Sequence, residues 1–380
     1  MVDAQIQSDY SQVPTEEISG RYVAALMRYG VPSYIENANV SMKALIIDRR
    51  IFPLAINTGT SQGCSSYVCS PYAHYLSYTT EEFAKRHSLV SASLLRALAL
   101  PFGGFLRSVG IDRVAFINNW LFSTNPSAEL SYEQIRAATM RVLEEYPDFA
   151  IVFRSVNSLL DQSLCKSLIE NGYRLVRSRR VYVLDARNRR HFERYNTQTD
   201  LKFLSKSSYS VITCQDKLEQ SASRMAELYQ ALYLSKHSPL NPHLNAQFFH
   251  LALREKILTF VGLGKDGRID GFVTYFVQGD RMTGAVLGYD LGMPQKIGLY
   301  RMLVAILIAR ASQQGHRLNL SGGVGHFKML RGALPVEEYD AVYDRHLRGG
   351  RRLAWGALRM GSRLGSRTKL PLPLPEQSDS

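Results

Sequence analysis

The chain has 380 residues, of which 45% are hydrophobic and 21% charged, and its formal net charge is +13. This composition is typical of a globular protein and excludes wholesale disorder, and no apolar run reaches the roughly 20 residues of a membrane-spanning helix. The start, MVDAQIQSDYSQVPTEEISG, is polar and acidic, unlike a secretory signal or an Arg-rich transit peptide. We therefore expect a cytoplasmic protein, long enough for two domains.

The basic excess fits an anionic ligand, such as a phosphorylated cofactor, a nucleic acid or an anionic lipid surface. Part of it is local, because residues 341–380 hold eight Arg and Lys against three acids. The four cysteines, Cys64, Cys69, Cys165 and Cys214, form no CxxC pair and match no zinc-ligand spacing. We expect reduced thiols and no metal, while a bridge between Cys64 and Cys69 stays open.

Apolar periodicity and turn residues predict alternating helices and strands in the first half of the chain. Helices are expected at 21–30, 87–101, 131–147 and 159–173. Strands are expected as a hairpin over 41–57 and singly at 111–123, 148–156 and 173–185. The aromatic-rich stretch 65–78 is predicted to be extended, with one aromatic face in the core.

The second half repeats this pattern. Helices are expected at 217–237, 245–256, 299–315 and 325–332, and strands at 209–216, 257–264, 269–278, 281–290, 317–322 and 336–347. Both halves end helix, strand, helix, strand, which predicts two similar α/β domains. Because the polar stretch 186–208 lacks apolar periodicity, it is the best boundary. The predicted units are a lead-in (1–20), two domains (21–195 and 196–350) and a basic, mobile tail (351–380), for which a disordered state is favoured over a membrane-surface helix.

Three stretches carry a resemblance to a known superfamily: VLGYD at 286–290, PQKIGLY at 294–300 and LNLSGGVGHFKMLRGALPVEEYDAVY at 318–343. They resemble the acyl-CoA N-acyltransferase (GNAT) superfamily, and more narrowly its tandem-domain branch of Fem-like aminoacyl-transferases and BioF2-like acetyltransferases. The likeness covers about residues 209–347, and the first half fits by element order. It implies an α/β fold (an α+β mixed sheet) of two GNAT-like domains in tandem, each with a central, mostly antiparallel twisted sheet flanked by helices.

Such domains bind the donor's pyrophosphate at a helix N-terminus, where unpaired amides and the helix dipole meet the anion. The usual pattern is Gln or Arg, two residues, Gly, one residue, then Gly or Ala. The corresponding residues are Gln295, Lys296, Gly298, Leu299 and Tyr300. Tyr300 replaces the second small residue, which puts the usual cofactor geometry in doubt. A helix-capping loop without a ligand is the structural alternative.

The resemblance also implies that strand 281–290 diverges from its neighbour and leaves amides free for the reacting carbonyl. Gly288 would then let the acyl group pass close to the backbone. Asp290, at the end of this strand, is the first candidate for orienting or deprotonating the attacking amine. A glycine that serves packing is an equally good interpretation of Gly288.

Other residues are candidates for the same chemistry. His326 is a candidate to accept the proton, because histidine side chains in general titrate near neutral pH. Tyr339 or Tyr343 is a candidate donor to the leaving group, and His237 lies in a loop that would cover the acceptor. Each of them has a purely structural alternative.

Three glycines in four residues, Gly322, Gly323 and Gly325, indicate that a backbone or a ligand comes close. Lys328 follows them, and the resemblance implies that it faces the donor's phosphate or the reacting ester. Arg331 would lie on the same helical face and complete a cationic spot. A turn followed by a solvated lysine is the alternative.

These features favour a transferase that moves an acyl group from acyl-CoA to an amine of a small molecule or cell-envelope precursor, by direct attack in a ternary complex. No permanently bound cofactor is expected. One alternative takes aminoacyl-tRNA as the donor, which makes tRNA a partner. Another is a non-catalytic basic protein that docks on an anionic membrane through its tail.

Overall fold

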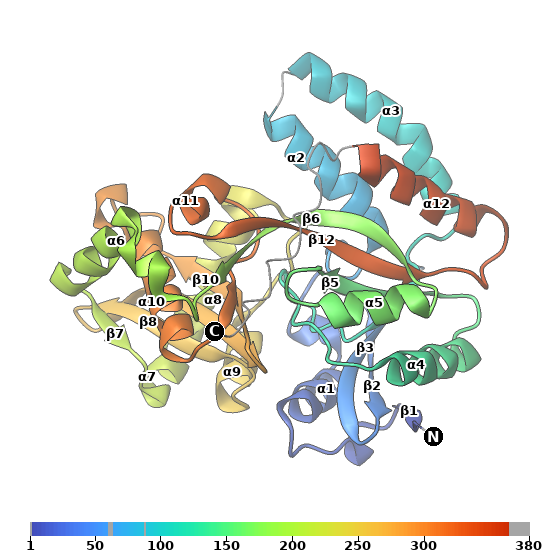
Figure 1. Ribbon diagram of the computed structural model, residues 1–380, viewed down its shortest axis with the longest axis horizontal. Helices are drawn as coiled ribbons and strands as arrows, with labels where there is room; N and C mark the ends of the chain where they lie inside the picture. Colours follow the sequence, from blue (N-terminus) through green and yellow to red (C-terminus); the bar gives the residue numbers. More distant parts are fainter. Residues whose placement is uncertain (1, 60–63, 87–88, 365–380) are drawn as a thin grey trace, which may run out of the picture.

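The computed structural model describes residues 2–59, 64–86 and 89–364. Within them, twelve strands form one sheet in the order β1-β2-β3-β4-β5-β12-β6-β11-β10-β9-β8-β7 (Figure 1). The strands are β1 (Ala4–Gln7), β2 (Ser41–Ile47), β3 (Arg50–Thr58), β4 (Arg113–Ile117), β5 (Ala150–Val156), β6 (Arg174–Asp185), β7 (Ser210–Ile212), β8 (Thr259–Lys265), β9 (Arg268–Gln278), β10 (Arg281–Tyr289), β11 (Arg317–Asn319) and β12 (Leu334–Tyr343).

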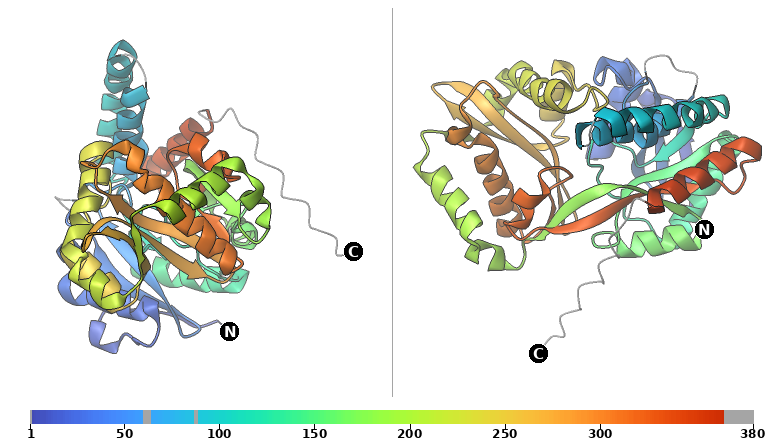
Figure 2. Two further views of the ribbon diagram at one scale, coloured as in Figure 1. Left: turned by 90° about the vertical axis from the view of Figure 1, so that its left-hand side faces the viewer. Right: turned by 90° about the horizontal axis from the view of Figure 1, so that it is seen from above.

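Helices cover both faces of this sheet (Figures 1 and 2). They are α1 (Ile18–Tyr29), α2 (Thr79–Arg86), α3 (Leu89–Ser108), α4 (Tyr132–Glu145), α5 (Gln162–Glu170), α6 (Tyr195–Lys206), α7 (Gln215–Gln220), α8 (Ala222–Gln230), α9 (Ala246–Arg254), α10 (Leu299–Gln313), α11 (Gly325–Met329) and α12 (Gly349–Leu364). Two π-helical turns, η3 (Ala73–Tyr78) and η5 (Ala231–His237), lie among them. None of the helices in the described ranges is both long and apolar enough to cross a bilayer.

The hydrophobic core explains why the halves hold together. On one face a single cluster runs through both halves and includes Tyr22 of α1, Met225 of α8 and Phe248 of α9. On the other face one cluster lies beneath α4 and α5 and another beneath α10, and a small fourth cluster contains Leu160, Val181, Val183 and Val336. Because side chains of a strand alternate between faces, the apolar strands of each half fill both kinds of cluster.

The two halves exchange their last strands. The first half contributes β1 to β5 in chain order, followed by β12 of the second half; the second half contributes β7 to β11, followed by β6 of the first. β12 therefore pairs with β5 on one side and β6 on the other, and β6 pairs with β11. The long antiparallel pair of β6 and β12 crosses the middle of the molecule (Figure 1).

The expected α/β fold, a mostly antiparallel mixed sheet flanked by helices, is confirmed. β4 pairs with β5, and β10 with β11, in parallel, and the other neighbouring strands pair antiparallel. The division into domains 21–195 and 196–350 stays a proposal. In the structure, the sheet of each proposed domain is completed by a strand of the other domain.

Three segments differ from the sequence interpretation. The polar boundary stretch contains α6, whose fully buried positions are Thr197 and Asp200, so no apolar pattern revealed it. α3 continues through Pro101 to Ser108 instead of ending at the proline. The stretch 65–78, expected to be extended, contains the π-helical turn η3.

The start of the predicted mobile tail is ordered. α12 packs Ala354, Trp355 and Leu358 inward, while Arg351 donates from Nε to the Val109 carbonyl at 3.0 Å. The disordered interpretation, based on the glycines of this stretch, is therefore wrong up to residue 364, because burial of the tryptophan outweighs their low helix propensity. The rest of the predicted tail, 365–380, lies outside the described residues.

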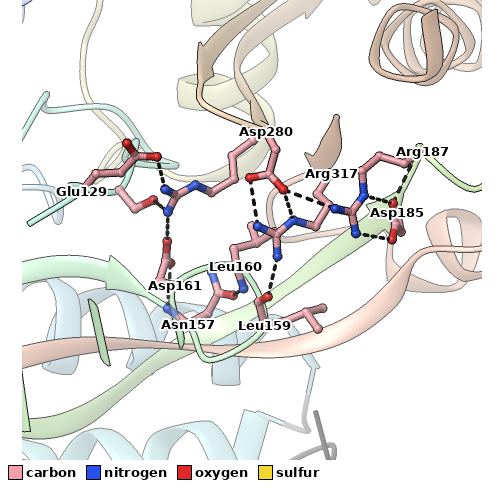
Figure 3. Close-up of polar contacts among 11 residues, drawn as sticks. Glu129, Asn157, Leu159, Leu160, Asp161, Asp185, Arg187, Asp280 and Arg317 are labelled. Atoms are coloured by element: carbon pink, nitrogen blue, oxygen red, sulfur yellow. Dashed lines mark hydrogen bonds and ion pairs between the residues drawn. The ribbon is translucent and has the colours of Figure 1, made fainter. Parts of the chain in front are cut away.

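A chain of ion pairs joins the halves on one side of the exchanged strands (Figure 3). Arg281 of β10 donates to Asp161, just before α5, at 2.7 Å. Arg317 of β11 donates to both oxygens of Asp280, at 2.8 and 2.9 Å, and to the Leu159 carbonyl at 3.0 Å. Asp161 is almost fully buried, so its charge depends on this partner, and burial raises its pKa.

We expect Asp161→Ala to lower the free energy of unfolding by about 3 kcal/mol, because it leaves the largely buried Arg281 guanidinium without its buried partner. Urea unfolding followed by circular dichroism measures this. Glu145→Ala, which removes the half-exposed partner of Arg141, is the control and should cost about 0.5 kcal/mol or less. Equal losses in the two variants would show that the ion pairs do not hold the halves.

Candidate active site

β10 and β11 diverge beside the predicted donor loop. They pair in parallel from Arg281 to Thr283, and β10 then continues to Tyr289 without β11. We call this region, residues 284–289 together with 320–328, the fork. Tyr300 of α10 packs against Tyr289 at 6.0 Å and against Phe327 at 5.0 Å between ring centroids, so aromatic rings link its two arms.

The N-terminus of α10 carries no side-chain cap. Its N-cap is Gly298, with φ 68°, a conformation that favours glycine, and the first turn holds no acid. A Cβ on Gly298 would also lie 2.8 Å from the Phe203 ring, a second reason for the glycine. Gln295 and Lys296, just before it, are exposed. The first amides of α10 thus keep the partial positive charge of a helix N-terminus.

The helix of the first half that corresponds to α10 is α4, and its N-terminus is capped by side chains. α4 connects β4 to β5 as α10 connects β10 to β11. The Ser131 hydroxyl accepts from the Gln134 amide at 3.3 Å, and the Gln134 side chain accepts from the Ser131 amide at 3.0 Å. Glu133 adds a negative charge to the first turn. This capping box satisfies the amides and disfavours an anionic ligand.

The divergence of β4 and β5 is likewise filled by the protein itself. Asn119 donates to the Val68 carbonyl at 2.9 Å and accepts from Arg154 and from the Leu121 amide, each at 3.0 Å. The two halves share one framework, and the second half is the one whose helix terminus is not closed by its own side chains.

Lys328 points inward, contrary to its predicted place beside the donor. Its side chain is buried, and Nζ donates to the carbonyls of Leu320, Ser321 and Gly322 at 2.7, 3.2 and 2.6 Å. Burial lowers the pKa of Lys328 to about 7, whereas the three carbonyl oxygens favour the ammonium form. We infer that the charged amine holds the turn of the fork in place.

Two glycines of this turn allow it to lie close to β6 of the same chain. A Cβ on Gly325 would lie 1.8 Å from the Tyr182 hydroxyl, and one on Gly322 would lie 3.2 Å from the Arg180 carbonyl. Gly323 has φ 71°. The close approach that the glycines indicated is therefore a contact within the protein.

Other predicted residues near the fork are occupied. The Asp290 carboxylate forms ion pairs with two arginines, accepting from Arg224 at 2.6 Å and from Arg268 at 2.8 Å. A Cβ on Gly288 would lie 2.9 Å from the backbone of α8, so this glycine permits helix packing instead of passage of an acyl group. The Thr274 hydroxyl accepts from the Val286 amide and donates to the Val286 carbonyl, so this amide is not free for an oxyanion.

The remaining predicted residues are not gathered at one site. Arg331 is buried, pairs with Asp200 of α6 and donates to the Phe327 carbonyl at 2.6 Å. His326 and His237 are exposed. Tyr343 packs in the first-half core and lies 5.3 Å from the Tyr173 ring, whereas Tyr339 lies on β12 opposite Val156 of β5. The strand exchange places both tyrosines beside β5 of the first half.

A buried charged cluster at the junction of the halves was missed from the sequence. Arg179 of β6 donates to Glu338 of β12 at 2.7 Å and to Thr124 at 3.2 Å, and Thr124 donates to Ser321 of the fork at 2.5 Å. A bulge in the β6–β12 ladder lies at this position. Bulges commonly redirect side chains next to active sites.

The cluster continues on the first-half side. Tyr75 donates to Asp340 at 2.8 Å, and His74 contacts the Ser178 hydroxyl at 2.9 Å. Among the described residues, Glu338 Oε1 and His74 Nδ1 are buried without a hydrogen-bond partner. Unsatisfied buried groups of this kind often mark a bound water or ligand. The arrangement thus presents a carboxylate oxygen and a neutral imidazole next to the fork.

Two sequence signals could have revealed this cluster. Arginines within the strand 173–185 face acids within the strand 336–347, and charges inside buried strands require partners. The pattern Ala-x-Tyr-Leu-Ser also occurs twice, at 73–77 and 231–235, and both copies form π-helical turns. Such turns are frequent at functional sites.

A pocket of about 450 Å³ lies apart from the fork, beside η3. Its lining includes Arg107, Asp112 and Cys64, and none of the predicted site residues. The Sγ atoms of Cys64 and Cys69 lie 3.3 Å apart without a disulfide bond, and all four cysteines are free thiols. Among the residues described, no group of His, Cys, Asp and Glu side chains is arranged to hold a metal ion.

We expect Lys328→Met to lower the free energy of unfolding by about 2 kcal/mol, because three carbonyl oxygens of the turn lose their donor. Lys296→Met removes the same charge from an exposed position and should change stability by less than about 0.5 kcal/mol. Chemical denaturation compares the two variants. If Lys328→Met unfolds at the wild-type midpoint, the ammonium does not hold the turn.

Burial, together with Arg154 and Arg179, lowers the pKa of His74 to about 3. Below about pH 6.5 the unfolded chain therefore binds a proton here that the folded chain does not, and stability falls as the pH falls. Between pH 7 and pH 5 the wild type should lose about 2 kcal/mol more than His74→Gln in urea unfolding. A His74→Gln profile parallel to that of the wild type would contradict the assignment.

No family model and no curated protein matches the sequence. Among solved structures, the chain is similar to the C-terminal DUF2156 domain of a putative lysylphosphatidylglycerol synthetase from Agrobacterium fabrum, with 14% identity and a TM-score of 0.46 over 65% of this chain and 81% of that one. It is similar to FemX, with 8% identity and a TM-score of 0.44 over 60% and 80%.

A tandem GNAT protein from the clavulanic acid biosynthesis pathway matches over 90% of this chain and 98% of its own, with 9% identity and a TM-score of 0.39. Solved structures similar to this chain thus include a Fem-type protein and a tandem GNAT protein, each with a TM-score below 0.5.

Proposed function

We propose that the chain is a transferase that moves an acyl group from acyl-CoA to an amine of a small molecule or cell-envelope precursor. The observation that carries this proposal is the contrast between two matching helices. α4 is closed by a capping box and an acidic residue, whereas α10 starts with an uncapped glycine and is preceded by exposed Lys296. A donor pyrophosphate fits the second arrangement and is repelled by the first.

In this proposal the pyrophosphate binds the amides of Leu299 and Tyr300, with Lys296 adding a positive charge. The acyl end extends toward the fork, whose arms are joined by Tyr289, Tyr300 and Phe327. Tyr300, which takes the place of a small residue in the usual pattern, is half-buried against Phe327 and so turns its bulk toward the fork.

The acceptor amine would bind at the junction cluster. Glu338 has one carboxylate oxygen held by Arg179 and the other without a partner among the described residues, which suits an ammonium group. His74 is neutral and has a free ring nitrogen, so it suits an uncharged amine that is ready to attack. Thr124 and Ser321 connect this cluster to the fork, so donor and acceptor would meet there in a ternary complex.

The alternative donor is aminoacyl-tRNA. Tyr300 and the net charge of +13 favour it, because the departure from the usual pyrophosphate pattern would matter less for a nucleic acid held through many phosphates. Direct attack by the amine on the donor ester would remain the same.

Isothermal titration with CoA should show binding that weakens about ten-fold in Lys296→Glu, because a negative charge replaces a positive one beside the helix terminus. The control is Arg136→Glu, which makes the same charge change at an exposed position of α4 and should leave the affinity for CoA at the wild-type value. Equal weakening in both variants would point to a general charge effect.

Absence of CoA binding at millimolar concentration would contradict the acyl-CoA version. Filter binding of tRNA and of a random RNA of equal length, each at two salt concentrations, then tests the alternative. Preference for tRNA would support it, and equal binding of both RNAs at low salt would remove it as well.

A further inference from the structure

α3 and α12 lie side by side at one edge of the molecule, and α3 extends away from the rest of the fold (Figures 1 and 2). Their contact is close, since a Cβ on Gly350 would lie 2.6 Å from the Val109 side chain, just after α3. Arg351 also donates to the Val109 carbonyl. The two helices therefore present one surface, which we call the α3–α12 face.

This face exposes large apolar side chains. Leu100 of α3 is 74% exposed, and Leu353 and Met360 of α12 are each 66% exposed. Among the large hydrophobic side chains described elsewhere in the chain, Tyr195 is 78% exposed and the next, Val324, is 58% exposed. Leu353 and Met360 are seven residues apart and lie on the same side of α12, opposite the buried Trp355. The helix thus has a second apolar stripe, which no residue in the described ranges covers.

The same segments are strongly basic. Residues 89–110 and 345–364 contain eight arginines and no Asp or Glu. Arg107, Arg348 and Arg352 are exposed. Because arginine can lay its aliphatic stem along an apolar surface and keep its charge at the polar boundary, this mixture suits a lipid interface.

We propose that the α3–α12 face docks on an anionic lipid surface, with Leu100, Leu353 and Met360 in the outer acyl layer and the arginines at the headgroups. Charge complementarity between the arginines and the anionic headgroups gives the attraction. The exposed leucines and methionine favour lipid over RNA, whose backbone offers them no apolar partner. This docking is independent of the acyl donor proposed above.

Vesicle flotation of the full-length protein tests the proposal. Vesicles of phosphatidylcholine with phosphatidylglycerol should carry the protein at low salt, and vesicles of phosphatidylcholine alone should carry about ten-fold less. The double variant Leu353→Glu/Met360→Glu should lose binding about ten-fold, because both changes put a negative charge into the apolar stripe.

The matched control is Met140→Glu/Ile169→Glu, two exposed apolar residues on α4 and α5 that are each 52% exposed. It carries the same charge change and should keep near wild-type binding, apart from the small effect of net charge. Thermal unfolding close to that of the wild type establishes that each variant is folded. Equal losses in the two double variants, or no flotation with anionic vesicles, would overturn the proposal. Binding of tRNA that is lost in the α12 variant, without any vesicle binding, would assign the face to RNA and overturn it as well.

Discussion

The pairing of β6 with β12 is the interaction on which the rest of the structure depends. Each strand leaves its own half and completes the sheet of the other, so the twelve strands form one continuous sheet. Charges inside the pair reinforce it: Arg177 donates to Glu337 at 2.6 Å, and Arg179 donates to Glu338 at 2.7 Å. Because both glutamates are buried, these pairs also fix which residues face each other, since a shift of register would leave buried charges unmatched.

The exchange also determines where the candidate site lies. It brings Arg179, from the first half, and Glu338, from the second, to the point where the fork meets the first-half loop that carries Thr124. The cluster lies in the middle of the sheet, so residues from both halves are held by paired strands and not by mobile loops. The two halves, built alike, differ at their helix termini: α4 is closed by the capping box of Ser131 and Gln134, whereas α10 is left uncapped at Gly298.

Much of the fold could be predicted from the sequence because its strands and most helices follow apolar periodicity. The mixed sheet, its hairpins and the helix 299–315 were predicted in this way. α6 was missed because its buried positions are Thr197 and Asp200, the latter neutralised by Arg301 and Arg331 across the chain. Such a helix has no apolar stripe to detect. The strand exchange was also invisible, since apolar patterns show that a strand is buried but not which neighbour it pairs with.

The candidate site shows the same limit more sharply. The position of the helix terminus followed from a local motif, Gln295 to Gly298, and the structure places it at the start of α10. The roles given to Lys328 and Asp290 depended on side-chain direction, and both turned out to be engaged by carbonyls or arginines of the same chain. Gly325 and Gly288, which were candidates for ligand contacts, allow close packing against Tyr182 and against α8. A short motif thus locates a backbone feature better than it assigns a partner to a side chain.

The order in which the strands join the sheet bears on how the protein is made. β12 follows β7 to β11 in the chain, yet it lies between β5 and β6. During synthesis β5 and β6 therefore lack the strand that separates them until β7 to β11 have also left the ribosome. Open strand edges readily pair with strands of other molecules, so the nascent chain must be shielded, or its second half must fold quickly, for the sheet to close on itself.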